Sequence, residues 1–432
     1  MARIDWNINK ENHFSLRYNM LYADADDSAN SLQSFKFRGA EYTNINRTHS
    51  ILSELNTIKN WGSNTLRVGY TRLRDGRTSP MSLPAVIING LGERSNGSAT
   101  IGTNPYSGCN VLKQDVFIFG DDIHIRGAGT HYITIGTSNE IYRADNLYLA
   151  NARGTYTYAS LEDFLADNAT QYAYGYFASG EKNPPMTMGQ FALYAQDEYK
   201  IVRELTLTYG LRADIPVMFD TPEANETFNS GYFAKHGTMT GDIPRAQILI
   251  SPRVGIEWFN DDGTWNVHGS AGIYTGRIPF VWLSNCFSNT GVTQRGYTLD
   301  SSKGQYVPKF GEEPSGTDGM SSNPMLNIVA KDFRYPQVMR ATLAFEQSYK
   351  GWNFVVEGIF SKSINDLLIE NITAQDKGQL FLAVNSEMVT EQNSTTYYDT
   401  SLSKEYSSIY LLKNTSQGYG YSVSASVAKH FR

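Results

Sequence analysis

Apolar and polar residues alternate along the segments 188–200 and 205–218. From 205 onward, one face carries Leu205, Leu207, Tyr209, Leu211 and Ala213, and the other carries Thr206, Thr208, Gly210, Arg212 and Asp214. A period of two with this division predicts a strand that is apolar on one face and polar on the other. The segment 188–200 keeps the same alternation, and a short turn near 201–204 follows it. We therefore predict a hairpin over 188–218.

The same design recurs along the chain. Six hairpins are predicted, at 3–9 with 13–22, 47–59 with 64–75, 188–200 with 205–218, 248–259 with 264–275, 337–348 with 352–364, and 407–414 with 418–431. A seventh, less regular pair covers 114–126 and 130–149. The short turns hold ordinary turn residues, such as Asp-Asp-Gly at 261–263 and Lys-Gly at 350–351.

The connections between these hairpins are long, and they fall at 23–46, 76–113, 276–336 and 366–406. Loops of this size are uncommon in compact soluble domains. Strict alternation of short and long connections is typical of outer-membrane barrels, which have tight turns on one rim and extended loops on the other. The predicted fold is all-β: a partial antiparallel transmembrane β-barrel with long extracellular loops, with about 14 strands where transporter barrels have 22. Alternation alone does not separate a wide barrel from a soluble sandwich, whose polar face also meets water.

Tryptophan placement favours the barrel. Five of the six tryptophans lie at or near a short turn: Trp6, Trp61, Trp258, Trp265 and Trp352. Amphipathic rings collected on one rim are typical of a membrane–water interface. The alternative is that each ring packs locally beneath its own hairpin.

Composition agrees with this interpretation. The 432 residues include 28 Tyr, 21 Phe and 37 Gly, and no run of about 18 apolar residues predicts a transmembrane helix. In an alternating strand, polar residues separate the apolar ones, so a membrane-spanning strand contains no long apolar run. The formal charge of −6 and the lack of a basic stripe argue against a nucleic-acid partner.

Three segments resemble the barrel domain of TonB-dependent outer-membrane receptors, particularly the Bacteroidetes type with a carboxypeptidase-regulatory-like N-terminal domain. They are YAQDEY with LTLTYGLRAD (194–214), SPRVGIEW with GSAGIYTGRIPFVWLSN (251–285), and YPQVMRATLAFEQSYKGWNFVVEGIFSKSINDLL (335–368). Weaker similarity runs through 66–77 and 130–149. The resemblance implies energised uptake of a scarce nutrient through a barrel that an N-terminal plug blocks.

The resemblance also implies partners and a domain organisation. The expected partners are outer-membrane lipid, the TonB–ExbB–ExbD energising complex acting through the plug, and a surface lipoprotein. Residues 1–432 correspond to part of the barrel domain, without signal peptide, plug or C-terminal strands. We therefore expect this sequence to be an internal part of a longer receptor in the outer membrane of a Gram-negative cell.

The sequence predicts no catalytic, metal or cofactor site. The seven histidines are scattered, and the closest pair, His124 and His131, fits no zinc spacing. Paired acids such as Asp121-Asp122 lie in turns or at strand ends, where solvated charge is their ordinary role. Cys109 and Cys286 fall in different predicted loops, and their separation in sequence leaves a disulfide open.

Candidate substrate contacts lie in the longest loop. They are Arg277, Trp282, Tyr297, Tyr306 and Phe310. The segment 276–282 either folds over the barrel mouth to contact substrate or plug, or anchors its loop to the rim. Segment 297–324 is either a ligand-contact surface or a mobile loop. Segment 160–167 (SLEDFLAD) is predicted as a short helix with a Ser cap.

Three functions remain open at this point. The first is transport of a siderophore, glycan, peptide or cobalamin, without bond chemistry. The second is a structural or adhesive outer-membrane barrel whose loops bind surfaces or partner proteins. The third is a soluble secreted β-sandwich, which acts as a binding module.

Overall fold

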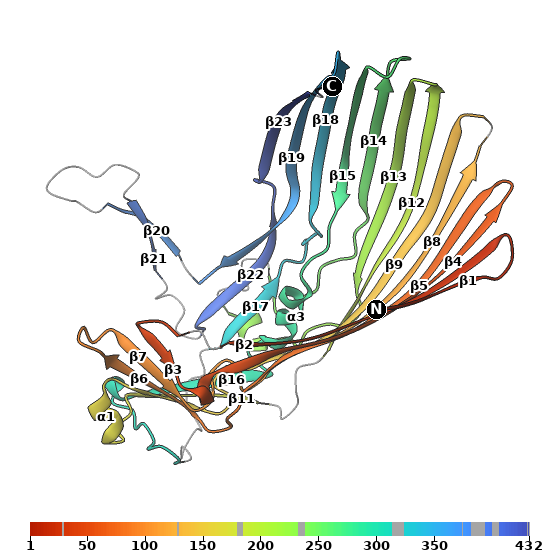
Figure 1. The fold of residues 1–432 in the computed structure, drawn as a ribbon. Helices are drawn as coiled ribbons and strands as arrows, with labels where there is room; N and C mark the ends of the chain where they lie inside the picture. Colours follow the sequence, from red (N-terminus) through yellow and green to blue (C-terminus); the bar gives the residue numbers. More distant parts are fainter. Residues whose placement is uncertain are drawn as a thin grey trace.

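The computed structural model describes residues 1–27, 30–127, 129–178, 185–231, 238–312, 324–373, 406–429 and 431, and the backbone of 375–381 and 394–399. Strands dominate, and 15 of them form one curved sheet that is open in Figure 1. In spatial order they are β1 (Ala2–Asn7), β2 (Asn12–Asp27), β4 (Tyr42–Lys59), β5 (Gly62–Thr78), β8 (Asn110–Arg126), β9 (His131–Tyr148), β12 (Met186–Val202), β13 (Leu205–Met218), β14 (Leu249–Phe259), β15 (Trp265–Thr275), β18 (Gln337–Tyr349), β19 (Trp352–Asn371), β22 (Ser408–Thr415) and β17 (Met325–Val329), with β23 (Tyr419–Lys429) also beside β19.

The register of this sheet lines up the apolar positions of neighbouring strands. Leu207 lies opposite Ile256, Val267 lies opposite Phe345, and Val356 lies opposite Ala425. Because side chains alternate between the two faces of a strand, each such pairing places the polar residues together on the other face. The result is one apolar face and one polar face that run from β1 to β19 over the turn-side part of the sheet. We call the polar face the inner wall.

The short and long connections lie at opposite ends of the sheet, as predicted. Six consecutive strand pairs, from β1–β2 to β18–β19, are antiparallel hairpins with short turns. The strands run further toward the long loops than the sequence predicts, since β2 reaches Asp27 and β19 reaches Asn371. Tryptophans occupy the turn end, where Trp258 and Trp265 meet edge to face across one hairpin with ring centroids 4.9 Å apart.

One predicted hairpin is wrong. Segments 407–414 and 418–431 do not pair with each other: β22 and β23 both pair with β19, one after the other along the same edge. The 20-residue length of β19 provides room for both. Gly418 lies in the break between them, where an added Cβ would come within 2.7 Å of Ser363 Oγ. The chain therefore continues in one direction at this point instead of turning back.

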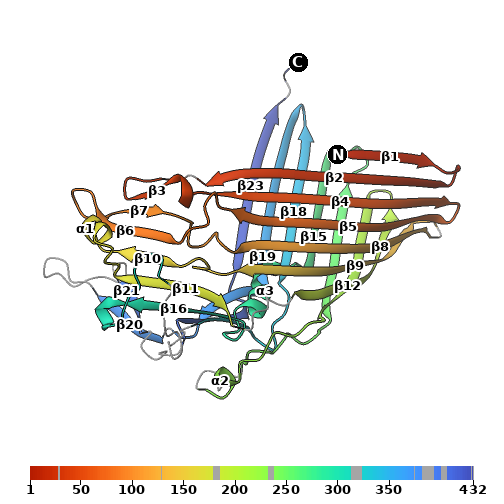
Figure 2. The same ribbon diagram turned by 90° about the horizontal axis from the view of Figure 1, so that it is seen from below.

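The long loops build a second sheet beyond one end of the first (Figure 2). Its six strands, in spatial order, are β16 (Gln294–Asp300), β11 (Gln171–Phe177), β10 (Thr155–Tyr158), β6 (Ala85–Leu91), β7 (Gly97–Ile101) and β3 (Ser34–Lys36). They come from four different connections of the large sheet, so we call this the loop sheet. A separate antiparallel pair, β20 (Gln375–Phe381) with β21 (Ser394–Asp399), lies in the 372–407 connection.

The helices of the described residues are short and lie in the loops. They are α1 (Leu161–Leu165), α2 (Glu226–Asn229), α3 (Phe280–Ser288), and the 3-10 turns η1 (Arg38–Ala40) and η3 (Ser301–Lys303). The predicted cap of α1 is confirmed, because Ser160 Oγ accepts the Asp163 N–H at 3.1 Å. The residue pattern did not predict α3. In the described part of the chain, no helix combines the length and apolar character needed to cross a membrane.

The two faces of the large sheet can be tested with neighbouring arginine substitutions on β18. Leu343→Arg places a cation on the apolar face, whereas Thr342→Arg places it on the inner wall. We expect Leu343→Arg to lower the free energy of unfolding by roughly 2–4 kcal/mol, because a cation in hydrocarbon is costly. Thr342→Arg should cost about 1 kcal/mol, since it loses one hydrogen bond to Ser270. Urea unfolding in phospholipid vesicles measures both, and equal costs would contradict a lipid-facing apolar side.

Candidate functional site

Charged and aromatic side chains form a connected row across the inner wall. Arg67 on β5 bonds Glu54 on β4, with Nε 2.9 Å from Oε2, and it also pairs with Asp122 on β8. The hydroxyl of Tyr194 on β12 donates to the other oxygen of Asp122. Arg212 on β13 lies 5.4 Å from the centre of the Tyr194 ring. Five strands are therefore joined through side chains as well as through their backbones.

The row crosses β9 at a glycine. Gly136 lies between Asp122 and Tyr194 in the register of the sheet. A Cβ on Gly136 would come within 2.5 Å of Asp122 Oδ1 and 2.6 Å of the Tyr194 ring and hydroxyl. Only a residue without a side chain leaves room for Tyr194 to reach across this strand.

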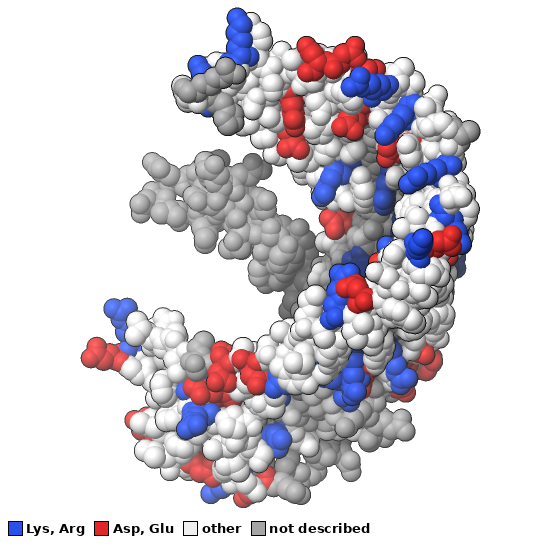
Figure 3. Space-filling model, turned by 45° about the vertical axis from the view of Figure 1, so that its right-hand side comes forward, with Lys and Arg blue, Asp and Glu red and all other residues white. Residues whose placement is uncertain are grey.

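The row continues toward the loops through Asp214, whose side chain is buried. Arg212 binds the two carboxylate oxygens of Asp214 through two nitrogens, each at 2.9 Å, and Gln190 Nε2 donates to the same carboxylate at 3.2 Å. Lys and Arg residues are interspersed with Asp and Glu over the face in Figure 3. Charges of both signs along the wall give no single-sign field, so the wall does not by itself select a cation or an anion.

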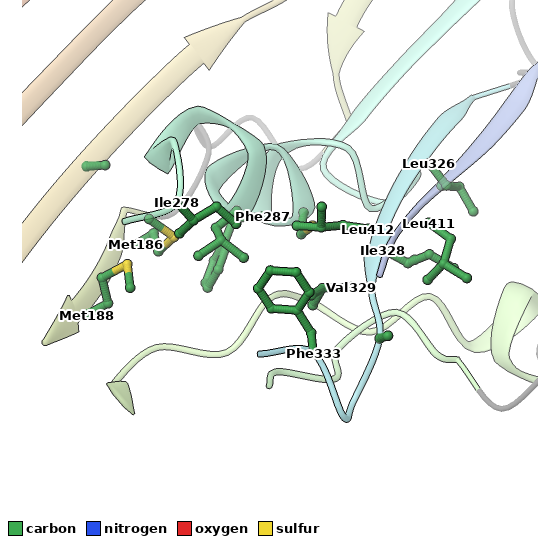
Figure 4. Packing of buried hydrophobic residues seen from close by; sticks show 14 of the residues in the cluster. Met186, Met188, Ile278, Phe287, Leu326, Ile328, Val329, Phe333, Leu411 and Leu412 are labelled. Carbon is green, nitrogen blue, oxygen red and sulfur yellow. The ribbon is translucent and has the colours of Figure 1, made fainter. Parts of the chain in front are cut away.

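Loop residues pack against the loop end of the inner wall. Residues of β12, α3, β17, β22 and the loops converge there in Figure 4. Residues of β9 and β14 belong to the same cluster. The fully buried members of this cluster include Met186, Met188, Phe228, Ile278, Leu283, Phe287, Leu326, Ile328, Val329 and Ile409. The cluster removes apolar surface from water and so holds α3 against the wall.

Trp282 packs against this loop cluster, and Arg277 lies beside it on the inner wall. The Arg277 guanidinium pairs with Glu140 on the inner wall and lies 5.9 Å from the centre of the Tyr142 ring. Trp282 packs, partly buried, against the cluster, and Asn146 Nδ2 donates to Asn285 Oδ1 of α3 at 3.0 Å. These contacts support the anchoring interpretation of segment 276–282. They hold the segment on the wall and do not test contact with a substrate.

Cys286 is buried in α3 and donates to the Trp282 carbonyl at 3.6 Å. No disulfide joins it to Cys109, although the structure describes both residues. Burial raises the pKa of the Cys286 thiol to about 12, so this thiol stays protonated at neutral pH. Over the described residues, no three His, Cys, Asp or Glu side chains gather as metal ligands.

The other three candidates lie at the loop sheet, away from this cluster. Tyr297 on β16 is buried in a row of tyrosines. The members of this row are Tyr156, Tyr172, Tyr174, Tyr176 and Tyr297, with neighbouring ring centroids between 4.6 and 6.5 Å apart. Alternating tyrosines in TYTY (155–158) and QYAYGYF (171–177) are the sequence signal that could have predicted these strands.

Tyr306 and Phe310 are exposed at one end of this row. The Tyr306 hydroxyl donates to Glu312 at 2.7 Å, and the Phe310 ring lies 5.4 Å from the Tyr156 ring. The Phe310 N–H donates to Asp167 at 3.3 Å, which ties its loop to the end of α1. The five candidates therefore do not form one site, and their contact with substrate stays a prediction. Residues 313–323 of the predicted loop surface lie outside the described residues.

A cleft of about 550 Å³ separates the loop sheet from the edge of the large sheet. One side consists of β16 from Gln294 to Leu299, and the other includes Asn289, Met325 and Ser407. Its volume is in the range of ordinary ligand sites. The cleft is therefore a candidate for binding a solute at the loop end of the structure.

Comparison with known proteins identifies the class. The family described as outer membrane beta barrel domain matches residues 1–432, and the chain belongs to it. The outer-membrane transporter YddB of Escherichia coli is similar in fold, with a TM-score of 0.57, 13% identity, and coverage of 99% of this chain and 44% of that one. A variant of the ferric enterobactin receptor PfeA of Pseudomonas aeruginosa is also similar in fold, with a TM-score of 0.51 and 10% identity. The match covers 98% of this chain and 48% of that receptor. No curated protein sequence matches significantly.

These comparisons confirm the partial barrel fold, the outer-membrane location and the resemblance to receptor barrels that the sequence predicted. They also rule out the soluble sandwich. The chain spans about half the length of the two solved structures. The type of N-terminal domain stays a prediction.

The glycine on β9 provides a test of the inner-wall row. We expect Gly136→Ala to lower the free energy of unfolding by about 1–3 kcal/mol, because its Cβ overlaps Tyr194 and Asp122. Gly120→Ala on β8 is the matched control, since its Cβ would meet only the Thr137 carbonyl at 3.4 Å. Urea unfolding of both variants is repeated in a Tyr194→Ala background. An unchanged cost of Gly136→Ala there would contradict the overlap with Tyr194.

The tyrosine row makes the stability of the loop sheet sensitive to alkaline pH. Burial, and next the neighbouring tyrosines, raise the pKa of Tyr297 to about 12 from an ordinary value of 10.0. A raised folded-state pKa means that its contribution is complete below pH 10 and is lost as pH rises toward 12. We expect Tyr297→Phe to flatten the loss of thermal stability between these values. Absorbance titration of phenolate should show no Tyr297 ionisation near pH 10 in the folded protein.

Proposed function

We propose that this chain forms part of the barrel and loops of a TonB-dependent outer-membrane receptor that imports a large or scarce nutrient. One observation supports it most: four long loops join in one sheet and other loops pack on the inner wall of an outer-membrane barrel sheet. Loops that turn inward over a polar wall suit capture and passage of a solute. An adhesive barrel, the alternative, would instead require loops that project away from the mouth.

The remaining parts of such a receptor belong to the same proposal. The chain covers about half of the solved transporter and receptor, and we propose that a plug and the remaining strands complete the protein elsewhere in a longer sequence. The plug would receive energy from the TonB–ExbB–ExbD complex, and a surface lipoprotein would cover the loops. The protein would do no bond chemistry, because import requires binding and conformational change only.

The inner-wall row supplies chemistry that suits a removable plug. One of its ion pairs, Arg67–Glu54, is partly exposed on the side away from lipid, with side-chain exposures of 40% for Arg67 and 30% for Glu54. Exposed pairs contribute little to stability by themselves, so they can exchange partners at low cost. We propose that polar groups of the plug bind this row and release it during transport.

Energised import can be measured without knowing the nutrient. Cells with and without the receptor, each with TonB present or depleted, are grown in a complex medium, and solutes that remain are quantified by mass spectrometry. We expect at least one solute to be consumed only when both receptor and TonB are present. Receptor-dependent consumption that continues without TonB would contradict the proposal, and surface attachment without consumption would favour the adhesive barrel.

A further inference from the structure

The strand β16 ends the loop sheet, and its outer edge borders the 550 Å³ cleft. In the described part of the chain, β16 has one neighbouring strand, β11. The Ala178 N–H donates to the Thr293 carbonyl and the Ser301 N–H donates to the Thr170 carbonyl, both at 3.0 Å. Odd-numbered residues of this segment therefore bond toward β11. Because backbone groups of successive residues point to opposite sides of a strand, the even-numbered residues point outward.

The outward backbone groups of Asp300, at the end of β16, already have a partner, Gln305. The Asp300 N–H donates to Gln305 Oε1 at 2.9 Å, and the Gln305 N–H donates to the Asp300 carbonyl at 3.3 Å. Gln305 thus satisfies both outward backbone groups of Asp300, as a residue on a neighbouring strand would. Gln305 also lines the cleft.

The next outward residues are Thr298 and Gly296, and both line the cleft. Among the described residues, none bonds their outward backbone N–H and carbonyl groups. They continue the line that Gln305 begins, at intervals of about 6.8 Å for every second residue. A ligand that follows this line must offer alternating donors and acceptors at the same spacing. An extended peptide does so with its main chain.

The charged residues around the cleft indicate which kind of peptide it would bind. The residues that line the cleft include two cations, Arg295 and Lys303, and no carboxylate. Both cations are exposed. Asp300 lies near Lys303 and offsets one positive charge, and its two carboxylate oxygens accept from the Ser302 N–H and from Gln171. Two cations against this one carboxylate leave a net positive charge beside the cleft. The cleft therefore favours a negatively charged ligand.

We propose that this cleft binds a short, extended, acidic oligopeptide that adds as a strand to the outer edge of β16. The peptide pairs with Thr298 and Gly296, continues the ladder from Gln305, and places acidic side chains near Arg295 and Lys303. In the receptor this peptide is the cargo, and that part rests on the function proposed above. The competing explanation is that the two cations only protect an exposed strand edge from aggregation.

Peptide chemistry separates these two explanations. The receptor in detergent is titrated with fluorescein-labelled Thr-Glu-Val-Glu-Val, and binding is followed by anisotropy. Two further peptides carry N-methyl groups on either the odd or the even residues, so that each loses one set of N–H donors. Strand addition predicts that one of them binds at least tenfold more weakly while the other stays within about threefold of the parent. Equal binding of all three, or no binding at 1 mM peptide, would overturn the inference.

Variants of β16 test the same contact from the protein side. Thr298→Pro removes the outward N–H without removing a bond to β11, whereas Thr298→Val keeps that N–H. We expect about tenfold weaker binding for Thr298→Pro and less than a twofold change for Thr298→Val. The N-methyl peptides keep the test decisive if the proline variant does not fold.

Substitutions of the two cations test the preference for an acidic peptide. The double substitution Arg295→Gln and Lys303→Gln should weaken binding at least fivefold and flatten its salt dependence. Lys309→Gln is the control, since Lys309 is exposed but does not line the cleft. Equal affinity for Thr-Lys-Val-Lys-Val would overturn the acidic preference.

Uptake of labelled peptide by cells, with and without TonB, tests the cargo assignment. TonB-dependent uptake of another nutrient without any peptide binding overturns this inference and leaves the proposed function standing. Peptide binding without peptide import overturns the cargo assignment.

Discussion

Backbone hydrogen bonding is the constraint on which this structure depends. Hydrocarbon offers no partner for a peptide N–H or carbonyl, so each strand inside a membrane must satisfy these groups on its neighbours. The continuous antiparallel ladder from β1 to β19 meets that requirement over long strands. The alternation of apolar and polar residues follows from it, because a paired strand can present one face to lipid only if every second side chain is apolar.

The ladder also places the loops. Since all long connections leave the same end of the sheet, segments far apart in the sequence arrive close together there. The loop sheet uses this arrangement, with β16 and β11 paired although about 120 residues separate them in the chain. The loop cluster uses it too, because α3 meets β9 and β17 on the inner wall. The rigid wall thus positions loop residues that have little local reason to fold by themselves.

The outer edge of β16 and the inner-wall row have different physical characters. The charged groups of the row pair with one another through Arg67, Tyr194 and Arg212, and only a glycine at 136 allows the line to cross β9. The edge of β16 instead keeps outward backbone groups beside a cleft, with Gln305 as the first rung. The inner-wall row connects neighbouring strands of the wall, whereas the outer edge of β16 presents hydrogen-bond donors and acceptors to a ligand.

The sequence by itself determined the barrel wall, because strand periodicity and turn chemistry are local properties. The hairpin over 188–218, the short turns and the capped helix at Ser160 were all predictable from neighbours within a few residues. Only the tertiary structure decided that β22 and β23 share one edge of β19, that 280–288 forms a helix on the wall, and that tyrosines of two loops stack in one row. These outcomes depend on which distant segments meet at the rim, and residue patterns carry no record of pairing across such distances.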